Sequence, residues 1–160
     1  MTDLLPLLQE FYRDKLSEVV RHIAGARVVS DYDANNTYQY IINREEMQLS
    51  WVAQAIVELS GEVPTAFAGG QDTSSASEDM PAVIGRDERD AQAFVDRWRP
   101  RVEAMANARH RRMLNVILGE TLEQKRFFEQ ALAGRHDLLG RRTDDVGLLV
   151  GKVLPTRWIE

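Results

Sequence analysis

Apolar residues recur at spacings of three and four along four stretches of the chain, which is the pattern of amphipathic helices. The first set is Leu5, Leu8, Tyr12, Leu16, Val19, Ile23 and Ala26. Gly61 and Pro64 end the second stretch, and Gly134 ends the fourth. The pattern predicts helices near residues 4–29, 36–60, 88–106 and 108–133.

The segments outside these stretches have no such period. Residues 65–87 are small and polar and include a Ser-rich run, so they predict a long connection between the second and third helices. For residues 135–160 we expect an irregular tail that packs its apolar side chains back onto the helices. The whole pattern predicts one all-α domain over residues 1–160, an antiparallel four-helix bundle with a long crossover connection.

Composition narrows the class of protein further. The chain has 160 residues, of which 44% are hydrophobic and 28% charged, and its net charge is −5. It has no cysteine, which excludes disulfides, thiolate metal sites and a cysteine nucleophile. No apolar run is long enough to span a membrane and no secretory signal follows Met1, so we expect a cytoplasmic protein.

A basic stretch lies around the join of the third and fourth predicted helices. The acidic net charge disfavours nucleic acid as a partner, and an arginine run of this kind is usually a solvated, ion-paired face. We therefore expect no nucleic-acid binding from Arg97, Arg99, Arg101, Arg109, Arg111 and Arg112.

Two segments carry a family resemblance. The second helix contains Glu45-Glu46-Met47-Gln48-Leu49 and ends Leu59-Ser60-Gly61-Glu62-Val63-Pro64, and the fourth contains Glu120-Thr121-Leu122-Glu123-Gln124-Lys125-Arg126-Phe127-Phe128. They resemble the metal-binding helices of rubrerythrin-type ferritin-like proteins, with patterns E-E-x-x-H and E-E-x-x-H-x-x-F-F. The resemblance covers about residues 4–134. It implies a ferritin-like bundle with a di-iron or di-manganese carboxylate centre that acts on oxygen or peroxide, or oxidises iron.

The ligand positions of this pattern are degenerate. Leu49 stands at the first histidine and Gln124 at the second, and Thr121 replaces a glutamate. On a helical projection, Glu45 falls on the apolar stripe of its helix and Glu120 on that of the fourth helix. We expect the acids of the first helix, Glu10, Asp14 and Glu18, to face solvent, and no inward carboxylate from the third.

The metal candidates are therefore Glu45 and Glu120, with His110 within reach of the same face of the fourth helix. Gln48 and Gln124 are the polar core residues expected to donate hydrogen bonds to these glutamates. A carboxylate on a core stripe needs a metal, a cation or donors. For Glu45 the cation would be an arginine or Lys15, the polar residue nearest the stripe of the first helix. Without a cation or a metal, Glu45 would lie at an end of the stripe that reaches solvent.

These residues are too few for the usual set of four carboxylates and two histidines. We expect a ferritin-like protein that has lost the di-metal centre, takes no cofactor and acts as a binding or structural module. We also expect a homo-oligomer formed through exposed apolar patches. Trp51 is a candidate for such a patch, either as a dimer face or as a dock for Trp158 and Ile159 of the tail. The alternative is an atypical oxidoreductase that uses iron or manganese on oxygen or peroxide, and whether the chain is an enzyme stays open.

A second resemblance rests on the segment His22-Ile23-Ala24-Gly25-Ala26. It is similar to a helix of the DinB-type four-helix bundles, which implies a metal bound by three histidines. The chain has three, His22, His110 and His136, and the last lies in the tail. A shared site would require the tail to fold over the bundle.

Overall fold

A computed structural model of the chain describes residues 3–66 and 78–135. These residues form four α-helices and no strand: α1 (Leu4–Ala26), α2 (Tyr32–Glu58), α3 (Met80–Glu103) and α4 (Ala108–Leu132). The predicted all-α bundle is confirmed. None of these helices is long and apolar enough to cross a membrane.

Side-chain caps explain where three helices begin. Asp31, Asp79 and Asn107 each accept a hydrogen bond from the backbone N–H three residues later, which pairs a donor that the first turn leaves free. Asp79 and the proline after Met80 start α3 at Met80 rather than near residue 88. The last part of the predicted connection therefore belongs to a helix.

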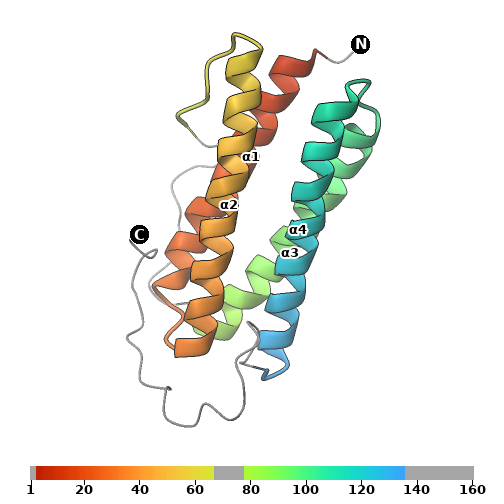
Figure 1. The fold of residues 1–160 in the computed structure, drawn as a ribbon. Coiled ribbons are helices and arrows are strands. Elements are labelled where there is room, and N and C mark those ends of the chain that lie inside the picture. The colour runs from red at the N-terminus through yellow and green to blue at the C-terminus, as the bar shows by residue number, and fades with distance from the viewer. Residues whose placement is uncertain (1–2, 67–77, 136–160) are drawn as a thin grey trace, which may run out of the picture.

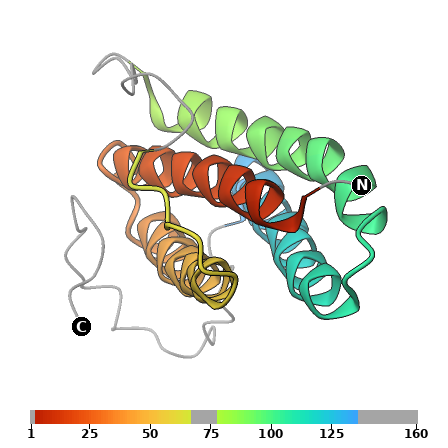
Figure 2. The same cartoon turned by 90° about the horizontal axis from the view of Figure 1, so that it is seen from above.

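The helices are arranged as two hairpins (Figure 1). α1 packs along α2 and α3 packs along α4, while contacts between the hairpins are fewer. α2 ends and α3 begins at opposite ends of the bundle. Seen from above, α2 and α4 lie on one side and α1 and α3 on the other (Figure 2). The Ser-rich run and the expected packed tail lie outside the described residues.

The apolar core consists of two clusters. The larger one fills the half of the bundle that contains the start of α1, around Phe11 and Trp98. The smaller one lies toward the other end and includes Ile42 and Phe128. Buried polar side chains occupy the space between them, and this layer contains the candidate site.

Candidate functional site

Lys15 lies at the centre of the polar layer. Its side chain is 0% exposed. The ammonium Nζ donates to Glu18 Oε2 at 2.8 Å, to Glu45 Oε1 at 2.9 Å and to Thr121 Oγ1 at 3.4 Å. Each of the three N–H groups therefore has an acceptor, and the acceptors come from α1, α2 and α4. This satisfies the donors of a lysine that water cannot reach.

Glu45 lies between two basic side chains. Its second oxygen, Oε2, is 2.7 Å from His22 Nδ1. Burial raises the pKa of Glu45, but His22 and Lys15 outweigh this effect and hold the pKa at about 2. Burial lowers the pKa of His22, but the Glu45 carboxylate, with Asp87 and Glu18, raises it to about 9. At neutral pH the group is therefore a carboxylate held between an ammonium and an imidazolium.

A second buried pair extends the layer to α3. The Tyr38 hydroxyl donates to Asp87 Oδ2 at 2.5 Å. Burial raises the pKa of Asp87, and burial together with Asp87 raises the pKa of Tyr38. Burial likewise raises the pKa of Glu18, against the effect of Lys15. The layer thus holds titratable groups from three helices in one water-excluded volume.

Aromatic rings close the layer on both sides. The Lys15 ammonium lies 5.1 Å from the centre of the Phe94 ring, a cation–π contact. Phe128 packs against His22 and Tyr38, with ring centres 5.6 Å and 5.5 Å away. Because these rings belong to the two apolar clusters, the charges are enclosed by hydrophobic side chains.

Glu120 belongs to a separate group at the seam between α2 and α4. Arg44 binds it in a bidentate way, at 3.0 Å and 2.5 Å, and Gln48 Nε2 donates to the same carboxylate. Burial raises the pKa of Glu120, but Arg44 and Gln48 outweigh this effect and lower it. The expected hydrogen bond between a core glutamine and a glutamate is thus present here.

The structure places His110 outside this layer, and among the described residues it gives neither Gln124 nor Glu45 the glutamine–glutamate hydrogen bond that the sequence predicts. His110 lies in the first turn of α4, ten residues before Glu120, which is about 15 Å along the helix. It lines a crevice of about 280 Å³ with Trp51 and Met113, and burial lowers its pKa. Gln124 is buried, and no described group bonds to its amide. Glu45 takes its partners from α1, namely Lys15 and His22.

Two expectations about inward carboxylates are wrong. Glu18 and Asp14 are buried rather than solvent-exposed, and α3 does supply an inward carboxylate, Asp87. α1 contacts both α2 and α3, so it is buried over a wider arc than its apolar stripe. Asp87 was missed because it fell in the predicted connection. The spacing of Lys15, Glu18 and His22 by three and four was the available signal, since it places all three on one face.

The structure also corrects the register of the family pattern on α2. Ferritin-like centres use a Glu-x-x-His pair on each of two helices. The inward pair three residues apart on α2 is Glu45 and Gln48, both 0% exposed, one position before Glu46 and Leu49. On α4 it is Thr121 and Gln124, as the sequence indicated. On both helices, the inward position that the family pattern gives to histidine is thus occupied by glutamine.

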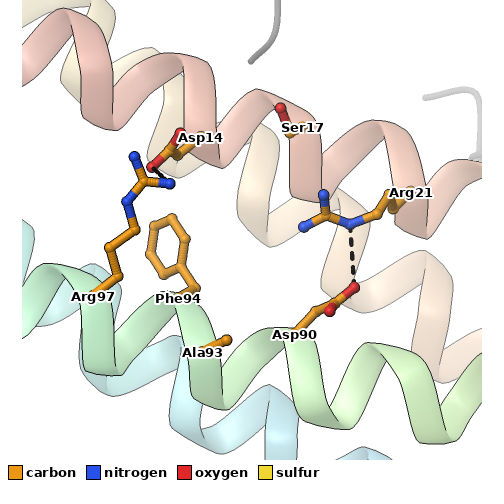
Figure 3. Close-up of a pocket in the computed structure, with 7 residues that line it drawn as sticks. All are labelled: Asp14, Ser17, Arg21, Asp90, Ala93, Phe94 and Arg97. Carbon is orange, nitrogen blue, oxygen red and sulfur yellow. Dashed lines mark ion pairs between the residues drawn. The ribbon is translucent and has the colours of Figure 1, made fainter. Parts of the chain in front are cut away.

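The opposite seam, between α1 and α3, is an ionic ladder (Figure 3). Arg97 pairs with Asp14 at 3.0 Å, and Arg21 pairs with Asp90 at 3.4 Å. Asp14 also accepts a hydrogen bond from the Trp98 indole at 2.9 Å. These pairs line a crevice of about 260 Å³, and each arginine there has an acidic partner. Of the six arginines in the basic stretch, Arg97 and Arg101 form ion pairs in this seam, and Arg109 pairs with Glu58.

Comparison with known proteins identifies the fold. No family model and no curated protein matches the sequence. Among solved structures, the bacterioferritin of Desulfovibrio desulfuricans superposes with a TM-score of 0.70 at 17% sequence identity, over 81% of this chain and 77% of that chain. The fold is that of the ferritin-like four-helix bundles. The structure of that bacterioferritin is described as showing its diiron site in different catalytic states.

The residues of this chain do not fit a di-metal centre of that kind. A metal ion between the inward carboxylates would lie where the Lys15 ammonium bonds to Glu18 and Glu45. Gln48 and Gln124 offer amides, which bind iron weakly compared with imidazole. Within the described residues, no three His, Cys, Asp or Glu side chains are grouped so that they could hold a metal ion.

Proposed function

We propose that this chain is a ferritin-like bundle in which the Lys15 ammonium replaces the metal ions of the centre. It acts as a binding or structural module rather than as an oxidoreductase. The observation that carries this proposal is the set of three hydrogen bonds from the fully buried Lys15 to Glu18, Glu45 and Thr121.

The charge of the layer supports the same conclusion. In a metal centre, divalent cations neutralise the inward carboxylates. Here Lys15 and His22 supply two positive charges beside Glu45, and Arg44 neutralises Glu120. A divalent cation added to this layer would face an ammonium and an imidazolium at close range, which is strongly unfavourable in a low dielectric.

The metal content of the intact chain tests the proposal. The chain is produced with added iron or manganese, purified without chelators and analysed by mass spectrometry of its metals. We expect far less than one iron or manganese per chain. About two per chain would establish the alternative, an iron or manganese oxidoreductase that acts on oxygen or peroxide.

The homo-oligomer predicted from the sequence is a separate part of this proposal. All six large hydrophobic residues that are exposed in the described chain lie on α2, just after it or on α4: Tyr40, Met47, Val57, Leu59, Val116 and Leu132. Light scattering on the full chain at micromolar concentration measures the assembly state. A monomeric mass would contradict this part and leave the proposal about Lys15 intact.

A further inference from the structure

One side of the bundle exposes apolar side chains that nothing in the described chain covers. This α2–α4 face consists of Tyr40, Met47, Trp51, Met113, Val116 and Phe127. Tyr40, Met47 and Val116 are 44%, 47% and 50% exposed. The other three are partly buried and pack on the apolar clusters.

The side opposite is built differently. The described parts of α1 and α3 carry no exposed large hydrophobic residue. Their seam is closed by arginines paired with acids (Figure 3). Among the described residues, only two ion pairs join α2 and α4, Arg44 with Glu120 and Arg109 with Glu58. The apolar exposure is therefore specific to one side of the fold.

The chain itself provides a segment of matching chemistry. Eight of the fourteen residues 146–159 are Val, Leu, Ile or Trp, and only Lys152 and Arg157 are charged. An apolar segment of this length needs to be covered, because exposed apolar surface is unfavourable in water. Among the described residues, the α2–α4 face carries three of the six exposed large hydrophobic residues, so it offers apolar surface for this segment.

The helix α4, which carries half of this face, ends just before the tail begins. Gly134 has φ 87° and, together with Arg135, returns hydrogen bonds to Ala131 and Gln130 at 3.1 Å and 3.0 Å. These two bonds form a Schellman motif, which ends the helix and turns the chain off its axis. Phe127, two turns earlier, packs on Tyr40 with ring centres 6.1 Å apart.

The length of the tail is sufficient to reach the whole face. Val116 lies sixteen residues before Leu132, about 24 Å along α4. Residues 136–145 can span up to about 33 Å when extended. Fourteen further residues span about 21 Å as a helix and more when extended, compared with about 17 Å from Tyr40 to Trp51 on α2.

We propose that the segment 146–159 docks on the α2–α4 face of its own chain, over Tyr40, Met47 and Val116. This proposal goes beyond the proposed function and does not depend on the identity of the cation at the centre. It leaves Val57, Leu59 and Leu132, which are outside the α2–α4 face, as the exposed apolar residues for the homo-oligomer. A second copy of the chain is the competing occupant of the same face.

Cross-linking in the full-length chain tests the docking directly, because the native sequence has no cysteine. Val116→Cys is combined with Val150→Cys, and the control combines Ala93→Cys on the α1–α3 side with Val150→Cys. Under mild oxidation we expect an intrachain disulfide in the first variant at least tenfold faster than in the control. Equal rates would overturn the proposal, and so would disulfide dimers of the single variant Val116→Cys, which would assign the face to a second copy.

Hydrogen exchange gives a second readout that needs no cysteine. In the native chain we expect residues 146–159 to exchange at least tenfold more slowly than an unstructured peptide. Met47→Glu places a charge on the face and should abolish this protection, whereas Ala93→Glu should preserve it. Unprotected exchange in the native chain, or equal protection in both variants, would overturn the proposal.

Discussion

Lys15 determines the character of the interior at the scale of single residues. A buried ammonium is tolerated only when its charge and its N–H groups are matched, and the matching groups become buried charges in turn. Glu18 and Glu45 bond to Lys15 at 2.8 Å and 2.9 Å, so removing the lysine alone leaves two carboxylates in an apolar enclosure. The effects of substituting Lys15 and Glu45 on the free energy of unfolding should therefore be coupled.

A double-mutant cycle tests this coupling. We expect Lys15→Met to lower the free energy of unfolding by about 3–5 kcal/mol, since it breaks a buried pair from one side. Glu45→Gln should cost less in the Lys15→Met background than in the native chain. Denaturant unfolding measures all four proteins, with Lys125→Met on the surface as a matched control. Additive effects of the two substitutions would contradict the coupling.

His22 makes stability depend on pH on the alkaline side. Its pKa in the folded chain is about 9, against 6.5 for a free histidine, because Glu45 favours the charged ring. A raised pKa contributes stability that is complete below about pH 6.5 and is lost as the pH rises through about 9. The loss amounts to roughly 3 kcal/mol for this one group.

Thermal or denaturant unfolding between pH 6 and pH 10 measures this loss. His22→Gln should remove most of the alkaline decrease, because no imidazolium is left to titrate. Glu45 contributes on the acid side, where its pKa of about 2 means that stability present above about pH 4.5 is lost as the pH falls toward 2. If the stability of His22→Gln fell between pH 6 and pH 10 as steeply as that of the native chain, the alkaline loss would belong to another titrating group.

At the scale of helices, periodicity and capping made most of the fold predictable from the sequence. Spacings of three and four placed all four helices, and Gly134 marked the end of α4. The start of α3 at Met80 was missed because its cap, Asp79, follows a Ser-rich run that has no helical period. Val83 and Ile84 are buried one turn before Asp87, so the first turns of α3 do carry apolar positions at helical spacing, but these positions were assigned to the connection.

The site was less predictable than the fold for a related reason. A single-stripe projection assumes that a helix is buried on one side, whereas α1 packs on α2 and also contacts α3. Lys15 and Glu45 were identified because each lies close to an apolar stripe. Glu18 and His22 complete the network from the flank of α1, where only the arrangement of the neighbouring helices decides burial.

A close approach of helices at Gly25 gives a test at this scale. A Cβ added at Gly25 would lie 3.1 Å from Val83, 3.3 Å from Asp87 and 3.3 Å from Tyr38. Gly25→Ala should therefore push apart the helices that form the Tyr38–Asp87 bond and lower the free energy of unfolding by about 1–3 kcal/mol.

Gly119 is the matched control for this substitution. It lies within α4, and a Cβ there would meet nothing within 4 Å. Gly119→Ala should stabilise the chain by about 0.5–1 kcal/mol, because alanine favours the helix over glycine. Denaturant unfolding measures both variants. Equal changes in the free energy of unfolding would show that the helices do not approach each other closely at Gly25.

At the scale of the whole molecule, two helical hairpins are joined through a charged layer between two apolar clusters. The fold is shared with a bacterioferritin whose structure is described by its diiron site, at 17% sequence identity. We propose that the Lys15 ammonium of this chain takes the place that metal ions have in such a centre.

Manganese binding by a single substituted chain tests this exchange most directly. In the native chain Glu18, Glu45 and His22 are not grouped so that they could hold a metal ion, because two of them bond to the Lys15 ammonium. Lys15→Ser removes the ammonium, so that the oxygen and nitrogen donors of these three side chains face a vacated volume and can bind a divalent ion. Electron paramagnetic resonance of added Mn²⁺, with circular dichroism to confirm folding, compares this variant with the native chain and with Lys125→Ser. We predict bound Mn²⁺ in Lys15→Ser only. Equal stoichiometric binding by the native chain would contradict the claim that Lys15 holds the place of the metal.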